Sequence, residues 1–371
     1  MKVSVVPFLA KYKIPLCLAF SVLALLPQRV VAQGCILTRN TSPVLGAQIS
    51  PYLQKGEWQA GMVYRQFTAD HQYQGTELSP LVTALGTNVI SKMYYTELTA
   101  TGALNPQWNL SLSLPIILNA SSNRALPQTS ADSPRFVQST SGIGDTIFTA
   151  RHWIMNTDHN TTQNVSVGAG LKIPTGNENA SDKFPNALGQ DLRERVVDQS
   201  IQLGDSGWGF LATLEAFKQF GNLSVFGSGV YLFNPKGQNR TLSPPSMLNP
   251  VGPLAVNEKQ RFNTVSDSYL VRAGVAYALP PLQGLSLSLA GRIEGVPVND
   301  LFGTTAGFRR PGYYLTLEPG IIYSRAKTTL ALNVPCRLHQ NVKPSLGFVR
   351  DSTFAGHTFL ASATYRFGGK H

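Results

Sequence analysis

The residues best suited to catalysis are the histidines and the acids that lie near them in the sequence. A hydrolase needs a serine or cysteine nucleophile beside a histidine, or a pair of carboxylates. Asp145 and His152 fall in one predicted strand at positions of opposite parity, so their side chains face opposite sides. Asp158 and His159 fall in a short turn. No His-Glu-x-x-His or Cys-x-x-Cys motif is present, so we expect no catalytic residue, no metal and no cofactor.

A second set of reactive groups consists of charged side chains that share one face of the predicted strands. If that face lines a lumen, seven basic and four acidic groups point into it. They are Arg65, Asp145, Arg151, Lys172, Glu215, Arg272, Arg292, Glu294, Glu318, Arg337 and Arg366. Charged side chains inside a pore set ion selectivity, which predicts a weak preference for anions. The alternative is that Arg and Glu pair across strands to hold the wall.

The elements that position these groups are strands with two different faces. From Trp108 to Leu118 every even position is apolar, whereas Asn109, Ser111 and Ser113 occupy the other face. Successive side chains of a strand point to opposite faces, so this alternation indicates a two-faced strand. Similar runs predict twelve strands, at 57–68, 88–104, 107–119, 144–155, 163–175, 206–219, 222–234, 268–279, 284–295, 313–324, 328–339 and 357–367.

The connections between these strands alternate in length. Long ones fall at 69–87, 120–143, 176–205, 235–267, 296–312 and 340–356, and each of the others has seven residues or fewer. Outer-membrane barrels combine an even strand number with short periplasmic turns and long external loops. Closure is required because hydrocarbon cannot hydrogen-bond an open sheet edge. The sequence therefore predicts an all-β, closed antiparallel transmembrane barrel of about twelve strands over residues 57–371, in the bacterial outer membrane.

Aromatic residues at the ends of the predicted strands support the same fold. Amphipathic rings suit the headgroup level, so barrels carry a girdle at each interface. We expect an inner girdle of Trp58, Trp108, Tyr277, Tyr323, Tyr365 and Phe367, and an outer girdle of Trp208, Phe233, Tyr269, Tyr313 and Phe359. Tyr365 and Phe367 also resemble the C-terminal signature that the barrel-insertion machinery recognises, although four residues follow Phe367.

The first 32 residues have the pattern of a cleaved signal peptide. Three lysines precede an apolar run from Ile14 to Leu26, and Val30-Val31-Ala32 forms a small-residue exit. Thirteen apolar residues are too few for a membrane-spanning helix, which needs about 20. An alternative interpretation makes Cys35 a lipid-modified first residue. Only 14% of the chain is charged, well below the roughly 25% of soluble proteins.

The charge and the cysteines add little to this prediction. Removal of the leader takes four basic and no acidic residues, so the net charge falls from +11 to +7. The basic residues are scattered without a run, so we expect no nucleic-acid partner. Cys35 and Cys336 would meet an oxidising compartment and are a possible disulfide. Residues 33–56 lack alternation, and they are either a plug inside the lumen or a periplasmic tail.

Five short motifs combine glycine with charged or apolar residues: Gly142-Ile-Gly-Asp145, Gly170-Leu-Lys-Ile-Pro-Thr-Gly176, Arg292 to Asp300, Gly307 to Gly312 and Glu318-Pro-Gly320. Together they resemble the outer-membrane barrel family named for the meta-pathway of phenol degradation. The resemblance implies an outer-membrane channel that admits aromatic or other small hydrophobic compounds. Asp300, Arg309 and Arg310 lie in the fifth external loop and are candidates for a gate. The alternative is an ion-paired loop anchor.

Taken together, the sequence predicts passive passage of small solutes rather than catalysis. A lipid-modifying hydrolase of the outer membrane is the second hypothesis, and a structural or surface-binding barrel is the third. The expected partners are outer-membrane lipid, lipopolysaccharide, the barrel-insertion machinery and small solutes.

Overall fold

The computed structural model describes residues 32–33, 50–245 and 258–369. The predicted signal peptide lies outside these residues, apart from Ala32. Cys35 and the apolar residues Ile36, Leu37, Val44 and Leu45 of the predicted plug also lie outside them.

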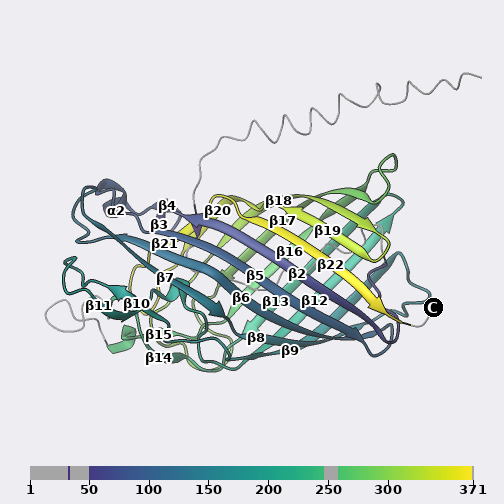
Figure 1. Cartoon of the computed structure of the whole chain (residues 1–371), viewed down its shortest axis with the longest axis horizontal. Coiled ribbons are helices and arrows are strands. Elements are labelled where there is room, and N and C mark those ends of the chain that lie inside the picture. Colours follow the sequence, from purple (N-terminus) through teal and green to yellow (C-terminus); the bar gives the residue numbers. More distant parts are fainter. Residues whose placement is uncertain (1–31, 34–49, 246–257, 370–371) are drawn as a thin grey trace, which may run out of the picture. The chain divides into compact units, whose positions relative to one another are not determined.

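The wall of the protein is a closed antiparallel barrel with twelve strand positions, which confirms the predicted fold (Figure 1). Ten positions hold one unbroken strand: β2 (Glu57–Ala69), β5 (Ile90–Ala103), β6 (Trp108–Ala125), β9 (Gln163–Ile173), β12 (Gly209–Phe220), β13 (Leu223–Phe233), β16 (Ser268–Ala278), β17 (Leu285–Val296), β18 (Gly312–Arg325) and β22 (Phe359–Gly368). Neighbours in sequence are neighbours in the wall, and the ring closes where β2 pairs with β22, with Trp58 opposite Phe367.

The other two positions hold interrupted strands. One consists of β7 (Arg135–Ile143) and β8 (Thr146–Trp153), and the other of β19 (Thr328–Asn333) and β20 (Cys336–Val342). Pro335 has no N–H to donate to a neighbouring strand, which explains the second break. The first break falls at Gly144 and Asp145, where the Asp145 carboxylate binds main-chain groups of other segments.

The barrel is apolar outside and polar inside, the reverse of a soluble protein. On β17, Leu287 and Leu289 are exposed, whereas Ser286 and Ser288 are buried. Hydrocarbon is the solvent that suits such an outer face. No helix within the described residues is long and apolar enough to span a bilayer.

Both predicted aromatic girdles lie on this outer face. Every member of the inner girdle is well exposed at the end that carries the short turns. In the outer girdle, Trp208 and Phe359 are exposed, and Phe233, Tyr269 and Tyr313 are partly exposed. The two rings of side chains frame the apolar band at its upper and lower limits.

The long loop predicted at 120–143 is wrong over most of its length. Strand β6 continues to Ala125 and β7 begins at Arg135, so the two form a tall hairpin with a loop of only nine residues. Polar residues such as Ser121, Ser122 and Asn123 interrupt the apolar alternation of β6. The signal on which the prediction relied is therefore absent from a segment that is still a strand.

The other long connections carry short elements that gather at the end opposite the C terminus, at the left of Figure 1. These elements are β3 (Gln72–Gln74), β4 (Glu77–Leu78), α2 (Pro80–Ala84), β10 (Ser181–Phe184), β11 (Arg193–Val196), the 3-10 helix η2 (Gln199–Ile201), β14 (Gln238–Leu242), the 3-10 helix η3 (Glu258–Gln260), β15 (Phe262–Thr264) and β21 (Ser352–Ala355). A further short strand, β1 (Ala32–Gln33), precedes the first wall strand and pairs with β21. Ile201 and Leu203 pack with Tyr95 and Ile117 of the wall, and Ala355 belongs to the same cluster. Loops therefore fold inward and narrow the outer mouth.

Candidate functional site: the lumen and its outer mouth

The middle of the lumen contains a lattice of buried ion pairs that crosses from wall to wall. Arg292 of β17 binds Glu294 at 2.6 Å, and Glu294 also binds Arg65 of β2 at 3.2 Å. Arg272 binds Glu318 at 2.5 Å, and Arg292 lies 3.7 Å from the same carboxylate. Strands β2 and β17 are not neighbours in the wall, so the Arg65–Glu294 pair spans the lumen.

The strand register explains why this lattice needs its acids. Arg272 and Arg292 stand directly opposite each other on β16 and β17, a placement in which like charges repel. Glu318 on the next strand, β18, reaches both of them. Removing one partner from a buried ion pair leaves an uncompensated charge, which costs about 3–5 kcal/mol.

A further buried pair joins β8 to β12 across the inner face of β9. Arg151 binds Glu215 at 2.5 Å. Strand β9 lies between the two, and its inner face carries Gly168 and Gly170 next to these residues. Because glycine has no side chain, the arginine reaches over β9 to the glutamate. Ion pairing between strands, one of the two alternatives considered for the lumen charges, is thus the arrangement of four arginine and glutamate pairs, and a fifth pair, Arg292–Glu294, lies within β17.

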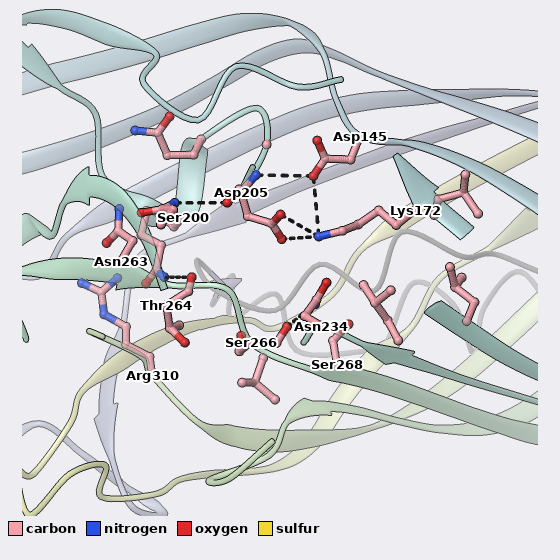
Figure 2. A pocket seen from close by; sticks show the side chains of 18 of the residues that line it. Asp145, Lys172, Ser200, Asp205, Asn234, Asn263, Thr264, Ser266, Ser268 and Arg310 are labelled. Carbon is pink, nitrogen blue, oxygen red and sulfur yellow. Dashed lines mark hydrogen bonds and ion pairs between the residues drawn. The ribbon is translucent and has the colours of Figure 1, made fainter. Parts of the chain in front are cut away.

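Three segments meet around Asp145, Lys172 and Asp205, as Figure 2 shows. The Lys172 ammonium donates to both Asp205 oxygens at 2.5 and 2.6 Å and lies 3.9 Å from Asp145. Asp145 accepts the backbone N–H of Gly176 at 3.0 Å. A side chain on Gly204 would stand 2.5 Å from the Gly176 carbonyl oxygen, so both glycines are needed for the backbones to approach. The two glycine-rich motifs, at 142–145 and 170–176, therefore fix the positions at which loop 176–205 begins and ends.

The outer mouth is tied together by the carboxylate of Asp198, beside η2. It accepts hydrogen bonds from Arg124 at 3.0 Å and Arg310 at 3.3 Å, and from the backbone N–H of Ser200 at 2.9 Å. These groups come from the tall hairpin, from the fifth external loop and from loop 176–205. Burial alone would raise the pKa of the Asp198 carboxyl, but the charges of Arg310 and Arg124 hold it well below its ordinary value.

The three predicted gate residues divide into two kinds. Asp300 and Arg309 form an ion pair with no exposed surface, and Arg309 also donates to Thr264 Oγ1 at 2.9 Å. Asp300 accepts the backbone N–H of Asp267 at 2.9 Å. Such fixed groups have the geometry of a loop anchor. Arg310, in contrast, lines the cavity drawn in Figure 2, on the side away from Lys172 in that view.

The inner end of the lumen is filled by aromatic rings. Tyr52 packs against Trp153 at 5.2 Å and Phe217 at 6.2 Å between ring centroids, and Phe226 belongs to the same buried cluster. The Tyr52 hydroxyl donates to the Asn160 carbonyl oxygen at 2.5 Å. The wall also binds the segment that contains Tyr52, through the side chain of Arg366.

Two further predicted lumen residues, Arg366 and Arg337, bind other segments of the chain and not an acidic side chain. Arg366 donates to the carbonyl oxygens of Ser50 at 2.6 Å and Tyr52 at 3.1 Å. Arg337 donates to the Tyr73 hydroxyl at 2.9 Å. Cys336 is half-buried and has no disulfide partner among the described residues.

Sequence reasoning missed several residues of the lumen. Glu97 and Trp153 are buried in the interior, and the parity rule applied to their strands would have found both. Tyr52, Arg124 and Asp198 lie in segments without alternation, so no sequence signal marked them. His152 stacks on Trp108 at 4.5 Å on the outer face while Asp145 points inward, as the opposite parity required.

Comparison with known proteins agrees with this architecture. The model of a family described as "Putative MetA-pathway of phenol degradation" matches residues 46–191. The predicted resemblance to that family is confirmed. Comparison with curated proteins gives no match.

The fold is similar to that of an outer membrane channel from Pseudomonas putida F1. The two have 15% sequence identity and a TM-score of 0.58, over 88% of this chain and 100% of the other. Weaker similarities are to a monoaromatic hydrocarbon channel, TodX (8% identity, TM-score 0.41, 88% and 93% of the chains), and to a FadL homologue from Pseudomonas aeruginosa (10%, 0.37, 90% and 96%). The first of these similarities shows that the fold is that of an outer-membrane β-barrel.

Proposed function

We propose that the protein is a passive outer-membrane channel for small solutes. The observation that carries this proposal is a series of three cavities inside the closed barrel. The outer cavity (about 80 Å³) and the middle cavity (about 180 Å³, Figure 2) share Ser200 and Arg310 in their walls. The middle cavity and the central cavity (about 170 Å³) share Ile147.

The walls of these cavities suit solutes with both polar and apolar parts. The central cavity is lined by hydroxyl groups together with the ion-pair lattice. The middle cavity adds the apolar side chains of Leu211, Val230, Leu232 and Val296. Together with the family description, this mixture supports aromatic or other small hydrophobic compounds as solutes of the channel.

We also infer that the segment predicted as a plug, residues 33–56, closes the inner end of the lumen with its last part, around Tyr52 and Leu53. Tyr52 and Leu53 are almost completely buried, and Arg366 of the wall binds the backbone carbonyl oxygens of Ser50 and Tyr52. A free periplasmic tail would not supply a ring to the core of the lumen. Solute passage on this scheme requires the segment around Tyr52 to move.

Liposome swelling tests the channel proposal directly. Ser228 lines the central cavity, whereas Val225 on the same strand is exposed on the outer face. Ser228→Trp fills the cavity, so we expect swelling in small sugars and aromatic acids to fall at least tenfold. Val225→Trp is the matched control and leaves swelling unchanged.

The same measurement separates the channel from an enzyme. Hydrolysis of the liposome lipid without solute entry would favour the lipid-modifying hydrolase. Absence of both swelling and hydrolysis in the wild-type protein would favour a structural or surface-binding barrel.

A further inference from the structure

The fifth external loop, between β17 and β18, exposes two large apolar side chains at its tip, residues 300–303. Leu301 is 61% exposed and Phe302 is 63% exposed. The adjacent ion pair of Asp300 and Arg309 has instead no exposed side-chain surface. A loop in water normally does the opposite, because hydration favours charged groups and disfavours apolar ones. The tip of the loop therefore has the same reversed burial as the outer face of the barrel wall.

Hydrogen bonds on its inner side hold the tip in one position. The Arg309 guanidinium, which binds the Asp300 carboxylate, also donates to the Val298 carbonyl oxygen at 3.1 Å. The backbone N–H of Leu301 donates to the Asp267 carboxylate at 2.9 Å, just before β16. The two exposed apolar side chains thus belong to a turn that is tied to the wall.

Backbone contacts also dock the tip on the segment that follows β13. A side chain on Gly303, where φ is +86°, would stand 2.2 Å from the Pro235 carbonyl oxygen. A side chain on Gly237 would stand 2.1 Å from the Thr304 carbonyl oxygen. Both glycines are therefore required for the two backbones to approach this closely, and the place of the tip relative to β13 is fixed.

The tip lies beside the outer aromatic girdle. The ring centroids of Phe302 and Phe233 are 5.5 Å apart. Phe233 stands directly opposite Phe210 in the register of β13 and β12, and Phe210 is well exposed on the outer face. Phe302 therefore continues the apolar outer face of the barrel beyond the end of β13.

A lysine stands at the same level. Lys236, between the two residues that contact the tip, is exposed, and its ammonium donates to the carbonyl oxygen of Ser206 at 3.0 Å and to the hydroxyl oxygen at 2.8 Å. Lysines at the edge of an apolar band place their charge among the lipid headgroups. The apolar tip is therefore at the boundary between headgroups and acyl chains.

We propose that the fifth external loop is a membrane anchor, whose Leu301 and Phe302 side chains insert into the outer leaflet just below the headgroups. Interfacial elements bury their apolar side about 5–10 Å into the headgroup and acyl boundary. Lipid is the partner that fits, because the tip continues a surface that already faces hydrocarbon. The inference does not depend on solute passage, since it requires only that the outer face of the barrel meets lipid.

The test attaches the environment-sensitive fluorophore NBD to Phe302→Cys, in a full chain whose native cysteines are replaced by serine, reconstituted in bilayers. The lipids carry a nitroxide quencher either near the headgroup or near the end of the acyl chain. We expect the nitroxide near the headgroup to quench the label by at least half, and the deeper nitroxide to quench it less. Val271→Cys, exposed on the outer face of β16, is the positive control, and both nitroxides should quench its label.

Leu188→Cys is the matched negative control. Leu188 is 65% exposed and also lies in an external loop. Its neighbour Gly189 packs against the Leu126 carbonyl oxygen at the top of the tall hairpin, away from the girdle. We expect either lipid nitroxide to quench this label by less than a tenth, whereas aqueous iodide quenches it freely.

Three outcomes would overturn the anchor. The first is equal quenching by the lipid nitroxides at positions 302 and 188, and the second is free access of iodide to the label at position 302. The third is protection of that label from iodide and nitroxide alike, lost when the protein is diluted in the bilayer, which would indicate contact with a second copy of the chain.

Discussion

The two ends of the lumen are closed by different interactions. At the outer end a buried carboxylate, Asp198, holds arginines from two other segments. At the inner end the ring of Tyr52 and three other aromatic rings fill the barrel. Ion pairs depend on charge and geometry, whereas ring packing depends on volume. The two closures should therefore respond to different perturbations, and one can be opened without the other.

The largest effect is expected from removing the ring at the inner end. Tyr52→Ala deletes the side chain that packs between Trp153 and Phe217, and loss of a buried aromatic ring costs about 3–5 kcal/mol. Single-channel conductance in planar bilayers should rise about tenfold. Tyr277→Ala, on the outer face at the same end, is the control and should change nothing. If Tyr52→Ala and the wild-type protein have equal conductance, the Tyr52 ring does not close the inner end of the lumen.

A smaller rise is expected from neutralising the outer closure. Asp198→Asn leaves Arg124 and Arg310 without their shared carboxylate, a loss of about 3–5 kcal/mol for a buried pair. We expect a two- to fivefold increase in conductance, together with faster proteolysis of loop 176–205. Glu258→Gln removes an exposed ion pair, that with Arg261, which is worth about 0–1 kcal/mol, and should have no effect. If the two variants behave alike, the Asp198 contacts do not hold the mouth.

Acid should reproduce the Asp198→Asn effect only at low pH. The pKa of this carboxyl is lowered in the folded protein, so its stabilisation is complete above the ordinary pKa of about 3.9. It is lost as pH falls through the folded value. Conductance should thus be constant between about pH 5 and 8 and increase only below about pH 4. An increase near pH 6 would point to a different titrating group.

The smallest effect is expected from removing only the Tyr52 hydroxyl. Tyr52→Phe keeps the ring but deletes the bonds to Asn160 and Asn164. Burial raises the pKa of this hydroxyl, while the bond from Asn164 acts in the opposite direction, so the group is neutral at pH 7. The stability loss should be about 1 kcal/mol, measured by thermal unfolding, with conductance within twofold of wild type. A conductance equal to that of Tyr52→Ala would mean that hydrogen bonds, not volume, close the inner end.

Most of the barrel was predictable because each wall strand repeats one physical rule. Alternation along β17 placed Arg292 and Glu294 on the inner face before any contact was known. The same rule failed for the β6–β7 hairpin, where polar residues interrupt it. It also could not reveal that Arg65 and Glu294 meet, because strand order around a closed ring brings together positions more than 200 residues apart. Inward-folded segments such as that of Asp198 follow no period at all.

The seam between β2 and β22 sets a condition on biosynthesis. The ring is completed only when residues near the C terminus pair with the first wall strand, as Trp58 does with Phe367. A premature stop anywhere before β22 does not give a narrower pore. It gives a curved sheet with two unsatisfied edges, which hydrocarbon cannot solvate and which other chains can extend. Quality control in the cell envelope can therefore distinguish a complete barrel from a truncated one by the presence of the last strand, β22.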